Sequence, residues 1–365
     1  MNQFPFTPLV QKLPATIPFI GPETFERKTG RVFKARVGAN ESAFGISPKA
    51  RQAMIDAVDG VGWYNDPENY DLRSALAQLY NLPMDHISVG AGIDDLLGSV
   101  VRAFLEPGQV TVASLGSYLT YHYHVAGFDG VSYGVPYRDD RNDLQALVDA
   151  VRETGSHLVY VANPDNPTGT WHTAAKLQAF LDALPKDCMC VLDEAYFEFA
   201  PDDSILPMLP HDPRVIRMRT FSKAHGMAGA RIGYAIAHPE IVTALDKVRL
   251  HFNVNRVAQM GALASLGDAV FIQSVVQEVV KGRAEYDALG RELGLPTVPS
   301  ATNFVAFDCG TADRAQEILD GLIAGGVFVR KPGVQPLDRL VRVTVGSLEE
   351  RVVVAEVLRE VCKSH

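Results

Sequence analysis

The chain has 365 residues, of which 47% are hydrophobic and 21% are charged, and its formal net charge is −9. This is the composition of an ordinary globular protein with room for one large core and a smaller one. The acidic balance and the scattered basic residues disfavour a nucleic acid as partner, because a phosphate backbone requires a basic face.

Residues 1–34 are rich in proline and show no regular hydrophobic period. We expect them to form an irregular N-terminal arm that joins a small domain. Their start, "MNQFPFTPLVQKLP", lacks the apolar core and cleavage site of a secretory signal. No run of the sequence approaches the ~20 apolar residues of a membrane span. A cytoplasmic location without a membrane partner is therefore expected.

Residues 35–250 are expected to form a large cofactor-binding domain. From residue 85 to 240, short apolar runs alternate with amphipathic stretches such as 94–105 and 173–184. Runs without polar alternation are typical of strands that are covered on both faces. Their alternation with helices predicts an α/β fold with a mostly parallel sheet. The predicted strands are 87–90, 110–114, 130–135, 157–163, 188–196, 215–222 and 231–237.

Residues 251–365 have a different pattern of predicted elements and are expected to form a smaller α+β domain. Residues 255–268 and 271–293 have the pattern of long helices, and 302–309, 326–333 and 340–346 that of short alternating strands. The closing segment 347–363 is predicted as a helix, because Ser347 followed by Glu350 is a capping-box pattern.

No metal site is expected. The four cysteines, Cys188, Cys190, Cys309 and Cys362, contain no CxxC pair. Cys188 and Cys190 alternate along one predicted buried strand, which favours reduced structural thiols. The triplet "HYH" at 122–124 has no third ligand at a suitable spacing, so its histidines are interpreted as surface or core residues.

The polar and turn-forming residues follow the ends of five predicted strands. The sequences at these ends are "AGIDD", "LGSYLTY", "PDNPTGT", "EAY" and "SK", the last ending at Lys223. Because ligands of open α/β sheets bind beyond the carboxyl ends of the strands, we expect a site at this rim.

Two of these turns have both a structural and a functional interpretation. "GAGIDD" (90–95) opens a helix, so the amides of Ile93 and Asp94 can hold a phosphate. A plain strand–helix turn explains it as well, and Asp95 stands where a dinucleotide fingerprint needs glycine. "NPDNPTG" (163–169) is stiffened by two prolines, and this favours a functional Asn166 over a bare turn.

Asp193 ends an apolar strand, so it either caps the next segment or meets a cation. Asp193 with Glu194 is also typical of the magnesium-binding strand of an ATPase, but the chain has no phosphate loop of that class. Lys223 alone has the pattern of a surface lysine. Beside Thr220, Ser222 and Arg231 it suggests a phosphate site with a nucleophilic amine, because a neighbouring cation lowers the pKa of a lysine.

Together these residues resemble the fold-type I pyridoxal-phosphate aminotransferases, and most closely their histidinol-phosphate aminotransferase branch. The resemblance spans nearly the whole chain. It rests on the ordered motifs "NPDNPTG", "DEAY", "TFSK" and Arg231, with "ANESAFGISP" (39–48), "WYNDPENYDLRSALA" (63–77), "NF" (303–304), "GVFVR" (326–330) and "VRVTVGSLEE" (341–350).

The resemblance implies pyridoxal 5′-phosphate as cofactor and a role for each matching residue. Lys223 would form the Schiff base and shuttle the proton, and Asp193 would pair with the pyridine nitrogen. Asn166 and Tyr196 would hydrogen-bond the ring oxygen, and Tyr118 would stack on the ring. The phosphate would be held by Thr220, Ser222, Arg231 and the amides of Ile93 and Asp94.

The resemblance also implies a shared active site and an amino-group acceptor, 2-oxoglutarate. Tyr64 would reach the cofactor phosphate of a neighbouring subunit, which implies a homodimer. Arg342 would grip the substrate carboxylate by a bidentate pair. Asn40 and Arg330 are further candidate substrate-binding residues.

The chain departs from the family pattern around the side-chain pocket. Ser42 replaces the third polar residue of an "NEN" motif, Phe19 stands where many members have tyrosine, and Gly116 and Ser117 replace the residues before Tyr118. An aromatic amino acid is therefore an alternative donor to histidinol phosphate. A phosphothreonine-type decarboxylase is a second alternative. A cofactor-binding regulator and a nucleotide-dependent dehydrogenase are disfavoured.

Overall fold

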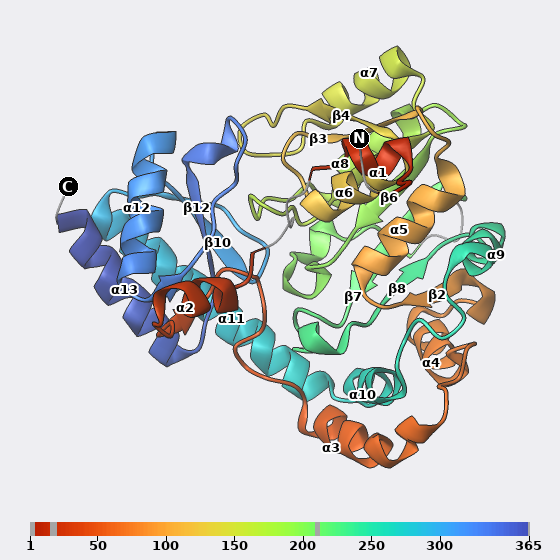
Figure 1. Ribbon diagram of the computed structural model, residues 1–365, viewed down its shortest axis with the longest axis horizontal. Coiled ribbons are helices and arrows are strands. Elements are labelled where there is room, and N and C mark those ends of the chain that lie inside the picture. Colours follow the sequence, from red (N-terminus) through yellow and green to blue (C-terminus); the bar gives the residue numbers. More distant parts are fainter. Residues whose placement is uncertain (1–3, 15–19, 209–211, 364–365) are drawn as a thin grey trace.

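The computed structural model describes residues 4–14, 20–208 and 212–363. Its largest sheet has seven strands in the order β2-β8-β7-β6-β5-β3-β4 (Figure 1). Only β8 is antiparallel to its neighbours, so the other six strands run in the same direction, as the sequence predicts. The strands are β2 Ile87–Gly90, β3 Val110–Ser114, β4 Val131–Val135, β5 Leu158–Ala162, β6 Met189–Asp193, β7 Val215–Thr220 and β8 Gly233–Ile236.

Helices cover both faces of this sheet, which explains why its strands show no polar alternation. Helices α5 Ile93–Phe104, α6 Leu119–Gly127 and α9 Pro239–Val248 pack on one face through a common core cluster. Helices α7 Leu144–Thr154 and α8 Ala174–Ala183 pack on the other. Helices α4 Tyr70–Tyr80 and α10 Arg256–Leu266 bury the edge formed by β2 and β8, and α3 Pro48–Ala57 packs on α10.

The C-terminal part has its own sheet and core. Strand β10 Phe304–Asp308 lies between β12 Leu340–Thr344 and β9 Thr297–Val298, and both neighbours are antiparallel to it. Helices α11 Ala269–Leu293, α12 Ala312–Ala324 and α13 Leu348–Lys363 complete this part, at the left in Figure 1. At the start of α13, the Ser347 amide donates to Glu350 and the Glu350 amide donates to Ser347 Oγ, so the predicted capping box is confirmed.

The N-terminal segment differs from the irregular arm that the sequence predicts. It contains two short helices, α1 Pro8–Lys12 and α2 Pro22–Thr29, each started by a proline in its first turn. Helix α2 lies against the C-terminal part, because Phe25 packs on Phe328 and Arg36 pairs with Glu23 and Glu26. Phe19 lies outside the described residues.

Strand β1 Ala35–Arg36 pairs with β11 Val327–Phe328 in a separate two-stranded sheet. The first residues of the predicted large domain therefore lie on the C-terminal part, and the domain boundaries at 34/35 and 250/251 stay a proposal. The remaining elements are single 3₁₀ turns at Val58–Gly62, Met84–His86, Phe197–Phe199, Asp202–Ser204, Ala228–Ala230 and Leu337–Arg339.

Several predicted strands are longer than the observed ones, most of all the one expected at 326–333, of which only Val327–Phe328 is a strand. The strand expected at 188–196 ends at Asp193, and Tyr196 lies in the turn that leads into the 3₁₀ helix Phe197–Phe199. The strand expected at 231–237 starts at Gly233, because Arg231 has a left-handed backbone (φ 57°) that no strand accommodates.

No single helix in the described part of the chain has the length and apolar composition to cross a membrane. Helices α10 and α11 meet that test only as a pair bent by 83°, and each buries one face in the protein core.

Candidate active site

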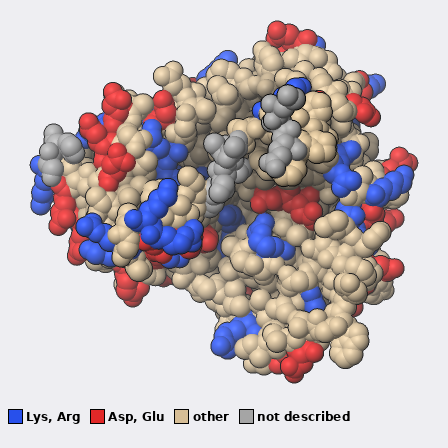
Figure 2. Space-filling model, in the orientation of Figure 1, with Lys and Arg blue, Asp and Glu red and all other residues tan. Residues whose placement is uncertain are grey.

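The carboxyl ends of β2, β3, β5, β6 and β7 lie along one edge of the large sheet, because these strands run in the same direction. The five turns singled out in the sequence follow these ends and come together there. Acidic and basic side chains gather in the hollow between the C-terminal part and the large sheet (Figure 2). The predicted rim is therefore a single site with charged groups of both signs.

Lys223 follows β7, and its side chain points toward the loop that follows β1. Its Nζ donates to the carbonyl oxygen of Asn40 at 2.9 Å and lies 5.6 Å from the centre of the Tyr196 ring. Burial, and after it the charge of Arg342, lowers the pKa of Lys223 to about 8. The sequence suggested Arg231 as the cation that lowers this pKa, but Arg231 is a minor contributor. A lysine with this pKa is partly an uncharged nucleophile at neutral pH.

Asp193 lies at the end of β6 and is 5% exposed. Its Oδ1 accepts the amide of Ala195 at 3.0 Å, and its Oδ2 accepts the hydroxyl of Tyr160 at 2.7 Å. Burial raises the pKa of Asp193 to about 6, although the Tyr160 hydrogen bond opposes this. An anion held in such a place is suited to stabilise a proton on a facing ring nitrogen.

Tyr196 and Asn166 lie on the side of the site that faces β12. The amide nitrogen of Asn40 donates to the Tyr196 hydroxyl at 2.9 Å, and Arg342 donates to Asn166 Oδ1 at 2.5 Å. Burial lowers the pKa of Arg342. The side chain of Asn40 also accepts a hydrogen bond from Thr344 (3.1 Å), so Asn40 joins the loop after β1 to β12 as well as to the site.

Arg231, Ser222 and the start of α5 form a cluster of hydrogen-bond donors, called here the anion pocket after its proposed role. Arg231 Nη1 lies 3.5 Å from Ser222 Oγ, and Nη2 lies 3.3 Å from Asp94 Oδ2. Thr220 Oγ1 lies 2.9 Å from Ser222 Oγ, which places both hydroxyls beside the guanidinium. Gly92 precedes α5 with φ +87°, and a Cβ there would overlap the guanidinium of Arg231. Helix amides, a guanidinium and two hydroxyls are a donor set that fits a phosphate.

Tyr118 lies between the anion pocket and Asp193. Its hydroxyl donates to Asp94 Oδ1 at 2.7 Å. Burial, and after it the charge of Asp94, raises the pKa of Tyr118, so the hydroxyl stays protonated. The residue is thus held at the site by Asp94, and its stacking on a ring remains a proposal.

Two predicted residues do not join this group. Tyr64 is 78% exposed and stacks on Phe252 with ring centres 4.4 Å apart. Arg330 forms a bridge with Arg342 in the backbone, and its guanidinium donates to the carbonyl oxygen of Ile20 in the N-terminal segment. Arg330 therefore lies where the N-terminal segment meets the site.

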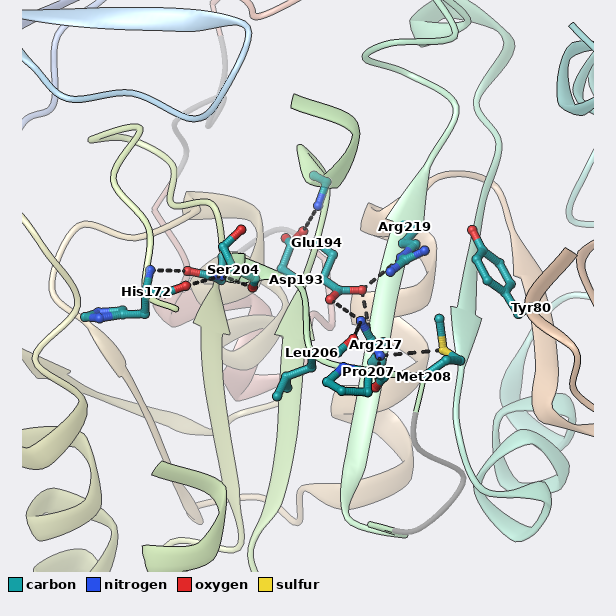
Figure 3. A network of polar contacts seen from close by, with 12 residues as sticks. Tyr80, His172, Asp193, Glu194, Ser204, Leu206, Pro207, Met208, Arg217 and Arg219 are labelled. Carbon is teal, nitrogen blue, oxygen red and sulfur yellow. Dashed lines mark hydrogen bonds and ion pairs between the residues drawn. The ribbon is translucent and has the colours of Figure 1, made fainter. Parts of the chain in front are cut away.

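Glu194, which the sequence paired with Asp193, belongs to a different network. It is 3% exposed and lies between Arg217 (2.6 Å) and Arg219 (2.8 Å), as Figure 3 shows. Burial alone would raise the pKa of Glu194, but Arg219 and Arg217 bring it below its ordinary value. Glu194 comes directly after the last residue of β6, and its carboxylate is held by two arginines of β7, which separates it from that of Asp193. The described residues contain no cluster that could hold a metal ion, and His122–His124 lie on α6.

Sequence reasoning missed three groups around the site. Tyr160 reaches Asp193 from the middle of β5, and Asn303 donates to the carbonyl oxygen of Asn40 at 3.1 Å. Glu198 and His225 form a buried pair behind Lys223, with Glu198 Oε1 3.6 Å from His225 Nε2. The only signal available for Tyr160 and His225 was a polar residue in an otherwise apolar run.

Comparisons with known proteins identify relatives of this chain. The profile of the family "Aminotransferase class I and II" matches residues 34–358. Histidinol-phosphate aminotransferase 2 of Carboxydothermus hydrogenoformans is 36% identical over 332 residues, which cover 89% of this chain and 90% of that protein. Histidinol-phosphate aminotransferase 1 of Cupriavidus pinatubonensis is 36% identical over 332 residues, with 90% and 88% covered.

Solved structures of aminotransferases are also similar to this chain. The crystal structure of histidinol-phosphate aminotransferase from Sinorhizobium meliloti in complex with pyridoxal-5′-phosphate superposes with a TM-score of 0.95 at 46% identity, covering 99% of this chain and 98% of that one. Aspartate aminotransferase from Thermus thermophilus superposes with a TM-score of 0.85 at 20% identity, covering 99% of each chain, and shows a shared fold.

Proposed function

The chain belongs to the class I and II aminotransferase family, and we propose that it transfers the amino group of histidinol phosphate to 2-oxoglutarate in histidine biosynthesis. It is a pyridoxal-phosphate-dependent aminotransferase. Supporting the choice of donor are the relatives named histidinol-phosphate aminotransferase and the solved structure of that name at 46% identity. A cytoplasmic location, expected from the sequence, stays a prediction.

The residues present fit the cofactor. The observation that carries this fit is one sheet edge that holds a largely buried amine at Lys223, a buried carboxylate at Asp193 and the anion pocket around Arg231. When bound, pyridoxal phosphate supplies an aldehyde that exchanges amines and a ring that accepts an electron pair. Asp193 would hold the ring nitrogen protonated, and the anion pocket would hold the phosphate.

The remaining groups would prepare the substrate. Lys223 Nζ, released from the carbonyl of Asn40, would take the proton from the donor Cα, since its pKa of about 8 suits a general base near neutral pH. Arg342, whose charge is buried beside Asn166, would bind the substrate carboxylate. The Tyr196 hydroxyl, fixed by Asn40, and Asn166 would both face the ring oxygen.

The amino donor is tested by measuring turnover with different donors and the release of carbon dioxide. We expect amino transfer from histidinol phosphate that requires 2-oxoglutarate, with phenylalanine at least tenfold poorer in kcat/KM. Lys223→Ala should lower kcat by roughly 10³-fold or more, because it removes both the nucleophile and the base, with an unchanged circular dichroism spectrum. Faster turnover of phenylalanine would indicate an aromatic aminotransferase. Carbon dioxide released without 2-oxoglutarate would indicate a decarboxylase.

A homodimer with shared sites is part of the proposal. Its support is an exposed aromatic and aliphatic cluster around Tyr64, namely Trp63 (77% exposed), Tyr64 (78%), Leu250 (72%) and Phe252 (45%). Apolar side chains gathered on a surface in this way are typical of protein interfaces. In the homodimer, Tyr64 of one subunit would complete the anion pocket of the other.

Mixing two inactive variants tests the shared site. Lys223→Ala and Tyr64→Ala subunits, unfolded together and refolded as a mixture, should regain activity, because a heterodimer has one site with both residues intact. Each variant treated alone is the control. A mixture that sediments as a dimer and regains no activity would contradict the sharing of the site, and an active monomer would contradict the dimer.

A further inference from the structure

The side chain of Tyr160 is directed at Asp193 by the register of the sheet. Strands β5 and β6 are parallel, with Ala162 opposite Asp193. Residues two apart on a strand share a face, so Tyr160 lies on the same face as Ala162 and Asp193. Its hydroxyl reaches Asp193 Oδ2 at 2.7 Å, while the Ala195 amide occupies Oδ1. The two donors fix the plane of the carboxylate and leave lone pairs on both oxygens for a group in the site.

Tyr160 has little freedom to turn away. It is 1% exposed, and its ring stacks on Tyr121 with centres 4.6 Å apart and planes 19° apart. Tyr121 is fully buried and is itself hydrogen-bonded to Thr111. Burial raises the pKa of Tyr160 well above its ordinary value, so its hydroxyl stays a donor. The two stacked rings thus form a rigid support for one hydrogen bond.

Groups around Asp193 act on its pKa in opposite directions, so a fixed donor matters for its charge. Burial and the nearby carboxylate of Asp94 favour its neutral form, whereas Tyr160, the Ala195 amide and Lys223 favour the carboxylate. Three described side chains act on Asp193 in this way, and two of them, Asp94 and Lys223, are charged. The third, the buried hydroxyl of Tyr160, is uncharged. Its effect therefore does not change when substrate or cofactor alters the charge of Lys223.

We propose that Tyr160 is a positioning residue for Asp193, whose fixed hydroxyl orients the carboxylate and holds it in the ionised form that the ring nitrogen of the cofactor requires. The inference rests on the role proposed for Asp193. It assigns to the middle of β5 a part of the site that none of the rim motifs contains.

The test compares Tyr160→Phe with Tyr121→Phe. Both remove one buried hydroxyl from the same stacked pair, but only the first removes a hydrogen bond to Asp193. We expect Tyr160→Phe to weaken the binding of pyridoxal phosphate to the cofactor-free protein by about tenfold to a hundredfold, as for a hydrogen bond to a charged group. Its kcat should fall while KM for 2-oxoglutarate stays within about threefold. Tyr121→Phe should leave cofactor affinity and kcat within about twofold of the wild type.

A second readout uses the protein without cofactor. The pKa of Asp193 lies above that of an unfolded aspartate, so the folded protein loses stability as pH rises toward 6. Without the Tyr160 donor this pKa rises further. Other buried acids such as Glu198 contribute equally in both variants, so the difference in free energy of unfolding between Tyr121→Phe and Tyr160→Phe should keep growing above pH 6.

Equal cofactor affinity and equal pH profiles in the two variants would overturn the inference. Asp193→Asn separates this failure from a failure of the proposed function. If Asp193→Asn abolishes turnover while Tyr160→Phe behaves as Tyr121→Phe does, only the role of Tyr160 is wrong. If Asp193→Asn retains cofactor affinity and turnover, the role proposed for Asp193 is wrong as well.

Discussion

Replacing Glu198 with glutamine should stabilise the protein at alkaline pH and have little effect at acid pH. Glu198 has a side chain that is 8% exposed, and within the described residues neither of its oxygens has a hydrogen-bond partner. Burial raises its pKa to about 8, although Arg219 opposes the shift. The folded protein therefore keeps a proton on Glu198 that the unfolded chain releases near pH 4.5.

The magnitude follows from this shift. Between pH 4.5 and 8 the folded state binds one more proton than the unfolded state, so the free energy of unfolding falls by up to about 1.4 kcal/mol per pH unit. Over the whole shift the loss is on the order of 5 kcal/mol, complete once the pH exceeds 8. Glutamine has the same shape and no proton to lose. Glu198→Gln should therefore match the wild type near pH 5 and exceed it by a few kcal/mol at pH 9.

The neighbouring His225 sets the pH range of the measurement. Burial lowers the pKa of His225 to about 4, so it is neutral in the folded state and contributes stability that is lost as pH falls from 6.5 to 4. Above pH 7, His225 is neutral in both the folded and the unfolded state. It therefore adds nothing to the change of the free energy of unfolding with pH, and Glu198 remains the expected contributor. His225 Nδ1 lies 2.7 Å from Ser265 Oγ, which leaves Nε2 facing Glu198 as an acceptor for its proton.

The assay is urea unfolding of the cofactor-free protein at one fixed protein concentration from pH 5 to 9. Glu153→Gln, an exposed glutamate of α7, is the control and should give the wild-type slope. A Glu198→Gln variant that is less stable than the wild type by the same amount at pH 6 and pH 9 would refute the reasoning. Glu198 would then be an anion paired with Arg219 throughout.

Two further predictions concern ligand binding. Arg342→Lys should raise KM for 2-oxoglutarate by about tenfold to a hundredfold because lysine cannot form the bidentate pair; Lys331→Ala is the control, and an unchanged KM would remove Arg342 from the carboxylate site. Gly92→Ala should weaken cofactor binding because its Cβ would displace the guanidinium of Arg231. Gly108→Ala is the matched control, since Gly108 also has a positive φ (+81°) but open space around it; equal cofactor affinity of the two variants, measured by titration, would contradict the predicted displacement.

The sequence by itself predicted the parts of this protein that depend on local pattern. Apolar runs alternating with helices indicated the mostly parallel sheet, and Ser347 with Glu350 indicated the start of α13. Lys223 and Asp193 were found because strand ends are marked by turn chemistry, and parallel strands bring their ends to one edge. Specific motifs in a fixed order then indicated the family.

The sequence predicted strand ends and helix starts less accurately where the backbone geometry is unusual. The left-handed conformation of Arg231 shortens β8, and the pattern of small residues around it did not reveal this. Two short helices of the N-terminal segment were missed because this proline-rich segment was expected to be irregular, although proline also favours the first turn of a helix.

Only the tertiary structure decided how side chains from distant parts of the chain meet. Asp193 and Glu194 are neighbours in sequence, but Asp193 lies at the candidate site and Glu194, which follows the end of β6, lies between Arg217 and Arg219 of β7. Tyr160 contacts Asp193 from 33 residues away, and Arg342 contacts Asn166 from 176 residues away. Such contacts depend on register and on the packing of one domain against another, and neither leaves a local period in the sequence. The sequence thus singled out the residues that we propose carry the chemistry, and the fold decided which groups hold them in place.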